Sequence, residues 1–136
     1  MTKSFDVTVA RIAEDNGWSR LRTAKDFVDA WSSFVAQCSR GYDMNIYEYE
    51  NDLSVRGMIE RLLSNEDLAR FPEFANFSDR VAEIDAEFRA LLQEGVEIRD
   101  SGTPWWERGV PRMAGAELAK DFSQMFGVAV REVPGR

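Results

Sequence analysis

The hydrophobic positions of this chain recur every three or four residues along much of its length. In residues 74–94, apolar side chains follow one another at spacings of three, four, three, four and three. This period places them on one face of an α-helix. Gly95 follows, where a glycine is expected to close the helix. The apolar positions are Phe74, Phe77, Val81, Ile84, Phe88 and Leu91.

A second helix is predicted to begin after Thr23, which forms a capping-box pattern with Asp26. Its apolar stripe runs to Cys38, and Gly41 lies where the chain would leave the helix. Residues 4–15, 66–71 and 113–126 have shorter or weaker helical patterns. Together these segments predict an all-α protein, a compact bundle of about five helices that forms a single domain over residues 1–136.

Residues 42–63 fit two helical registers, which place Arg56 in opposite surroundings. If a helix begins only at Asp52 or Ser54, Arg56 and Glu60 form an exposed pair worth about 0.3–0.5 kcal/mol. If the helix is continuous from about residue 43, Arg56 faces inward, one turn from Asp52 and one from Glu60. A buried guanidinium needs such partners, because an unpaired buried charge is very costly.

We expect a break near Asn51 and Asp52, since both residues favour helix ends over helix interiors. A kink there would still let Asp52 meet Arg56, and we predict that these two residues form a pair. Such a polar network would either fix the packing of the helices, which is the commoner role, or form the floor of a binding site.

A long loop is predicted before the last helix. Residues 96–112 have no sustained period and contain several glycines and prolines. Thr103 and Pro104 could begin one helical turn through Trp105 and Trp106. Adjacent side chains point in different directions, so we expect one tryptophan to reach the core. The other would either cover the end of the bundle or act as an exposed anchor for a partner.

The formal net charge is −7, and the acidity lies in the middle of the chain. Residues 41–100 hold 15 acidic and 6 basic side chains. Such a surface repels phosphate backbones, so we expect no nucleic-acid partner and favour a basic protein partner. An acidic balance that serves only solubility is the simpler alternative.

The chain has no histidine and one cysteine, Cys38, which lies on an apolar stripe and is expected to be buried and inert. Glu48, Glu50 and Asp52 could gather a hard cation, but this spacing does not place all three on one helical face. We therefore expect no metal and no cofactor, and lean against an enzyme. No apolar stretch is long enough to span a membrane, and the expected location is the cytoplasm.

These observations favour a small acidic protein-interaction module, such as an inhibitor, immunity or adaptor protein, that binds a more basic partner. The alternative is a helical bundle that binds a small molecule in an aromatic pocket anchored by Arg56. An enzyme that uses two carboxylates in one cleft is a third hypothesis. The predicted binding residues are Tyr47, Glu48, Tyr49, Glu50, Asp52, Arg56, Trp105 and Trp106.

Overall fold

The computed structural model describes residues 4–134 and is mostly helical, which confirms the predicted all-α class. Two short strands, β1 (Met113–Ala114) and β2 (Arg131–Glu132), pair in parallel. The helices are α1 (Phe5–Asp15), α2 (Ala24–Ser39), α3 (Ile46–Leu53), α4 (Val55–Leu63), α5 (Glu66–Ala69), α6 (Glu73–Ala90), α7 (Trp105–Arg108) and α8 (Ala116–Phe126).

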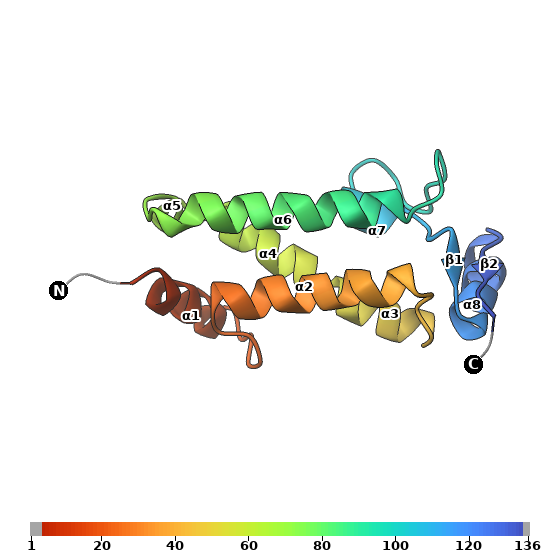
Figure 1. The fold of residues 1–136 in the computed structure, drawn as a ribbon, viewed down its shortest axis with the longest axis horizontal. Helices are drawn as coiled ribbons and strands as arrows, with labels where there is room; N and C mark the ends of the chain where they lie inside the picture. The colour runs from red at the N-terminus through yellow and green to blue at the C-terminus, as the bar shows by residue number, and fades with distance from the viewer. Residues whose placement is uncertain (1–3, 135–136) are drawn as a thin grey trace.

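The two longest helices, α2 and α6, pack along each other and run in the same direction (Figure 1). The chain returns between them through α3 and α4. One end of the molecule is formed by α1 and α5, whereas α7, α8 and the two strands lie at the other end (Figure 1). The loop before α7 therefore lies at the end of the molecule where α3 begins.

Polar side chains cap the starts of α1, α2, α3 and the short α5. Thr23 and Asp26 form the predicted capping box at the start of α2, and Asn45 caps α3 through a bond to the backbone of Glu48. Such caps satisfy backbone N–H groups that have no partner within the helix. After α2, Gly41 adopts a positive φ of 92°, as expected for the residue that ends a helix.

Two predicted helix boundaries were wrong. Helix α6 ends at Ala90, not near residue 94, because residues 91–93 hydrogen-bond to the backbone of residues 110–112 instead. Helix α8 begins at Ala116, not at residue 113, because Met113 and Ala114 pair with β2. In both cases a contact distant in sequence replaces a helical turn that the local pattern allowed.

The break in residues 42–63 falls at Ser54, slightly later than expected. Helix α3 ends at Leu53 and α4 begins at Val55, so both proposed registers are partly correct. The buried residues of α3 are Ile46, Tyr49 and Leu53, and Arg56 remains inward as the second residue of α4, as expected for the continuous register. The kink allows both the Tyr49 side of α3 and the Ile59 side of α4 to face the core.

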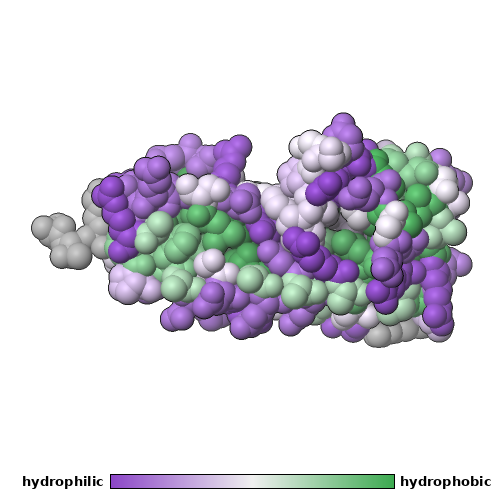
Figure 2. All heavy atoms as spheres, turned by 90° about the horizontal axis from the view of Figure 1, so that it is seen from above, coloured by the Kyte–Doolittle hydropathy of each residue, from purple (hydrophilic) through white to green (hydrophobic). Residues whose placement is uncertain are grey.

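Aromatic rings occupy the centre of the core. Trp31 on α2 is fully buried, and its ring packs against Phe34 and Phe88. The chain of rings continues from Phe34 to Tyr49 on α3. On the face seen in Figure 2, polar residues cover much of the surface, and apolar residues show toward both ends of the molecule. Through Tyr49, these aromatic contacts extend the core from the long helices to Phe122 on α8.

Candidate functional site

The most buried charged side chain within residues 4–134 is Arg56, which is 4% exposed. Its Nε donates to Asp85 Oδ1 at 2.8 Å, and its Nη2 donates to Asp85 Oδ2 at 2.9 Å. Its Nη1 donates to Glu60 Oε1 at 3.0 Å. Every nitrogen of the guanidinium thus has an anionic partner, which compensates for the removal of the charge from water.

Two tryptophans complete the surroundings of this pair. Trp31 Nε1 donates to Asp85 Oδ1 at 3.0 Å, and the guanidinium carbon of Arg56 lies 4.5 Å from the centre of the Trp106 ring. Burial lowers the pKa of Arg56, but the hydrogen bonds and charges of Asp85 and Glu60 outweigh it, so that its pKa is raised overall. The Arg56 guanidinium therefore stays charged. Together with Asp85 and the two tryptophans, it connects α2, α4, α6 and α7.

The predicted pair between Arg56 and Asp52 is wrong. Asp52 instead accepts a hydrogen bond of 2.6 Å from the Tyr42 hydroxyl. The spacing of Asp85 and Arg89 also predicts an exposed i,i+4 ion pair, but this pair is absent from the described part of the chain. Asp85 turns inward to Arg56, and the Arg89 guanidinium lies 3.8 Å from the centre of the Trp105 ring. A buried cation outcompetes a solvated one for the same carboxylate.

Tyr49 is buried, and its hydroxyl has no hydrogen-bond partner in the part of the chain that the structure describes. Its ring packs at centroid distances of 5.4 Å from Phe34, 5.4 Å from Tyr42 and 5.7 Å from Phe122. Burial raises the pKa of Tyr49 well above its ordinary value, so the phenol stays neutral. A neutral phenol can both donate and accept, and an unused buried hydroxyl is a costly feature to retain.

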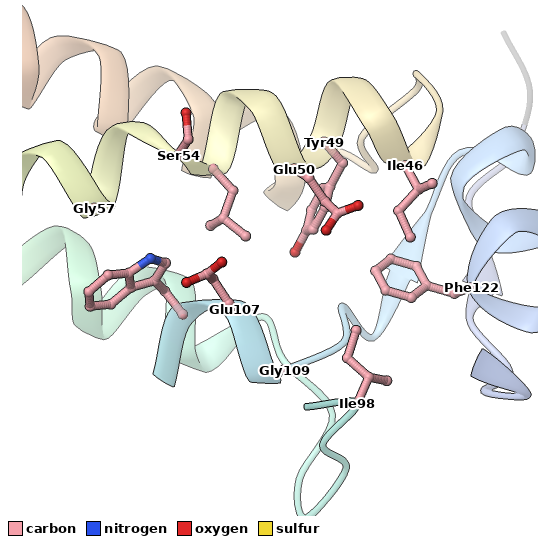
Figure 3. Close-up of a pocket in the computed structure, with 11 residues that line it drawn as sticks. Ile46, Tyr49, Glu50, Ser54, Gly57, Ile98, Glu107, Gly109 and Phe122 are labelled. Atoms are coloured by element: carbon pink, nitrogen blue, oxygen red, sulfur yellow. The ribbon is translucent and has the colours of Figure 1, made fainter. Parts of the chain in front are cut away.

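The hydroxyl of Tyr49 points toward a cavity between α3, α7 and α8 (Figure 3). The cavity has a volume of about 180 Å³. Two carboxylates, Glu50 and Glu107, line it, and Gly57 lines it where α4 begins. Its apolar walls are formed by Ile46, Leu53, Ile98, Trp106 and Phe122.

The structure brings together three of the predicted binding residues, Tyr49, Glu50 and Trp106, around this cavity. Trp106 is 7% exposed and Trp105 is half-buried, so the expectation that one tryptophan reaches the core is met by Trp106. Arg56 lies on the face of Trp106 but does not line the cavity.

The other predicted residues lie elsewhere. Tyr47 is 70% exposed, and Glu48 beside it is exposed, so both face solvent on α3. Asp52 is held by Tyr42 and lines a separate groove beside α2. Within residues 4–134, no three His, Cys, Asp or Glu side chains are placed to hold a metal ion together.

Sequence reasoning missed Asp85, Glu107, Ile98 and Gly57. A signal for Asp85 was present, since a buried tryptophan N–H and a buried guanidinium both require an acceptor. The residues of the loop carried no such signal. Their position depends on the bond from Ile98 N to Arg108 O and on the pairing of residues 91–93 with 110–112.

Comparison with known proteins does not assign this site. No family model matches the chain, and no curated protein or solved structure is significantly similar to it. None of the helices within residues 4–134 combines the length and the apolar character needed to cross a membrane. The candidate functions therefore depend on the geometry of the residues themselves.

Proposed function

We propose that this chain is an acidic protein-interaction module that binds a basic partner through the outer face of α3. The observation that carries this proposal is Tyr47, whose side chain is 70% exposed although α3 already buries its apolar side. Met44, at 37% exposed, precedes it, and Glu48 follows. An exposed aromatic ring among carboxylates suits a partner surface that offers arginine or lysine beside an apolar recess.

The charge of the molecule supports the same proposal. The excess of carboxylates lies in residues 41–100, which include all of α3. Opposite charges on two partners increase the rate of association, and this increase is lost as salt is added. A module of this kind would act by covering a basic surface, as an inhibitor, immunity protein or adaptor does.

A pull-down from the native host tests the proposal. The wild-type chain should retain a stoichiometric basic protein at low salt. Tyr47→Ala and Glu48→Lys should each reduce the retained amount several-fold, whereas Glu87→Lys, an equal charge reversal on the exposed side of α6, should not. Absence of a stoichiometric partner, or equal loss with all three variants, would contradict binding through α3.

The cavity favours a second function, the binding of a small molecule. The cavity is lined mainly by apolar residues with a few polar groups, which is the usual composition of a ligand site. Arg56 does not anchor it in this arrangement, because its three nitrogens already bond to Asp85 and Glu60. Ligand-dependent changes in tryptophan fluorescence test this function, since Trp106 forms part of the wall.

A further inference from the structure

We propose that the cavity between α3, α7 and α8 binds a small organic cation, a primary amine that carries an apolar body about the size of a benzene ring. This inference rests on the second function proposed above, the binding of a small molecule. It goes further because it assigns the charge, the size and the hydrogen-bonding groups of the ligand.

The volume and the walls set the size of the ligand. A cavity of about 180 Å³ with apolar walls resembles in size the engineered cavities of about 150 Å³ that take up benzene. Ile46 and Phe122 line it from α3 and α8 (Figure 3). Leu53 on α3 adds to these apolar walls, and Trp106 on α7 provides an aromatic wall. An aromatic or branched aliphatic group is suited to this space.

The Tyr49 hydroxyl provides a buried polar contact. The residue is 3% exposed, and its hydroxyl, which has no partner among residues 4–134, points into the cavity (Figure 3). Because its pKa is raised by burial, the phenol keeps its proton and also keeps lone pairs that can accept a bond from an N–H group. A ligand that bonds to this oxygen removes the cost of leaving it unpaired.

The charged groups of the cavity determine the sign of the ligand. Glu50 and Glu107 both line it, and no arginine or lysine within residues 4–134 does. Glu50 is held by Arg99 at 3.3 Å, an exposed pair of the kind that a bound cation displaces easily. An ammonium has three donors and no acceptor, which matches two carboxylates and a phenol oxygen. A carboxylate or phosphate ligand would be repelled by Glu50 and Glu107.

Gly57 also contributes to the size of the cavity. It lies within α4, and a Cβ added there would meet no atom of residues 4–134 within 4 Å, apart from its chain neighbours and the backbone of its own helix. No close neighbour therefore requires a glycine, although glycine in a helix is less stable than alanine. Because Gly57 lines the cavity, the missing side chain leaves room in it.

Titration of the full chain with three probes of one shape tests the inference. The probes are 2-phenylethylamine, the neutral 2-phenylethanol and the anionic phenylacetate, followed by isothermal calorimetry and by shifts in ¹H–¹⁵N spectra. The amine should bind about tenfold more tightly than the alcohol, and phenylacetate more weakly still. The shifts should include the Trp106 indole and the amides of Leu53 and Ile98.

Variants separate the contributions of the three groups. Glu50→Gln/Glu107→Gln should abolish the preference for the amine, whereas Glu87→Gln/Glu117→Gln, the same charge change on exposed residues outside the cavity, should keep it. Tyr49→Phe should weaken amine binding several-fold without unfolding the protein. A preference that survives Glu50→Gln/Glu107→Gln contradicts the assignment of these carboxylates.

Two further outcomes separate a failure of this inference from a failure of the second proposed function. Equal affinity for the three probes, or a preference for phenylacetate, overturns the cationic ligand but leaves small-molecule binding standing. Binding of none of them in the cavity, with only water at the Tyr49 hydroxyl, overturns both this inference and the second function.

Discussion

Arg56 on α4 and Asp85 on α6 form a two-point ion pair, with 2.8 Å between Nε and Oδ1 and 2.9 Å between Nη2 and Oδ2. The two residues are 29 positions apart, and their pairing joins the returning segment of the chain to its longest helix. A buried ion pair of this kind adds little to the free energy of unfolding, and its main effect is to fix how the helices pack. Removing one partner, however, leaves a buried charge without compensation.

Asp85→Asn is therefore expected to lower the free energy of unfolding by about 3 kcal/mol, measured by urea denaturation. Asparagine still offers an oxygen to Trp31 Nε1, so the loss reports mainly on Arg56. Glu83→Gln, which breaks the exposed pair with Arg80, is the control and should cost less than about 1 kcal/mol. Equal losses in the two variants would contradict a special role for the buried pair. Arg56→Met/Asp85→Asn should lose less than the sum of its single variants.

The helices and their caps could be predicted because they depend on local patterns. The capping box at Thr23 and the burial of the stripe through Phe88 follow from spacing and hydrogen-bonding chemistry. The inward position of Arg56 was one of two readings, and the kink at Ser54 reconciles them. The continuous register describes the buried face of α3 and the inward Arg56, and the register of a separate second helix describes the other buried residues of α4.

The partner of Arg56 and the cavity could not be predicted, because both depend on contacts distant in sequence. The i,i+4 spacing predicts a pair between Asp85 and Arg89. In the structure the Asp85 carboxylate instead binds the buried guanidinium of Arg56 on α4. Ile98 and Glu107 lie in a segment without a period, which takes its shape from backbone bonds to residues 91–93 and from the bond between Ile98 and Arg108. The sequence therefore predicted the cavity residues Tyr49 and Glu50 of α3, but not Ile98 and Glu107.

The hydroxyls of Tyr49 and Tyr42 should respond in opposite ways to the same substitution. Tyr49→Phe removes a buried group with no partner and should raise the free energy of unfolding, by up to about 1 kcal/mol. Tyr42→Phe removes the 2.6 Å bond to Asp52 and should lower it by about 1 kcal/mol. Thermal and urea unfolding of the two variants check this. A loss of stability in Tyr49→Phe would show that a water molecule or another group satisfies the hydroxyl.

The buried thiol of Cys38 should make stability fall in alkaline solution. Burial, and then the nearby charge of Asp52, raises the pKa of Cys38 from 9.0 to about 12. The folded state keeps its proton between these values while the unfolded state loses it, so stability present below pH 9 is lost toward pH 12. The slope from this group is at most about 1.4 kcal/mol per pH unit.

Urea denaturation at several alkaline pH values measures that slope. Cys38→Ala should make it shallower, whatever the substitution does to stability at neutral pH. Burial also raises the pKa of Tyr42 and Tyr49, which adds to the slope at higher pH, so part of it should remain in the variant. A slope that is the same with and without the thiol would contradict the assignment to Cys38.

Alanine at two glycines should have opposite effects on stability. At Gly57 the added Cβ meets no atom of the described residues within 4 Å beyond its chain neighbours and the backbone of its own helix. Alanine is also the better helix former, so Gly57→Ala should raise the free energy of unfolding by about 0.5–1 kcal/mol. At Gly115 the Cβ would lie 2.9 Å from the Asp43 Cα and 3.0 Å from the Tyr42 carbonyl oxygen. These are backbone atoms, so Gly115→Ala should cost about 2 kcal/mol.

The same Gly57→Ala variant links stability to the cavity. If the space beside α4 is used by a ligand, the more stable variant should bind 2-phenylethylamine several-fold more weakly than the wild type. Calorimetric titration at one temperature gives both affinities, and urea denaturation gives both stabilities. A gain in stability with unchanged affinity would place the ligand away from Gly57, against the walls formed by Trp106 and Phe122. A loss of stability would show that the helix needs its glycine, in conflict with the open space around it.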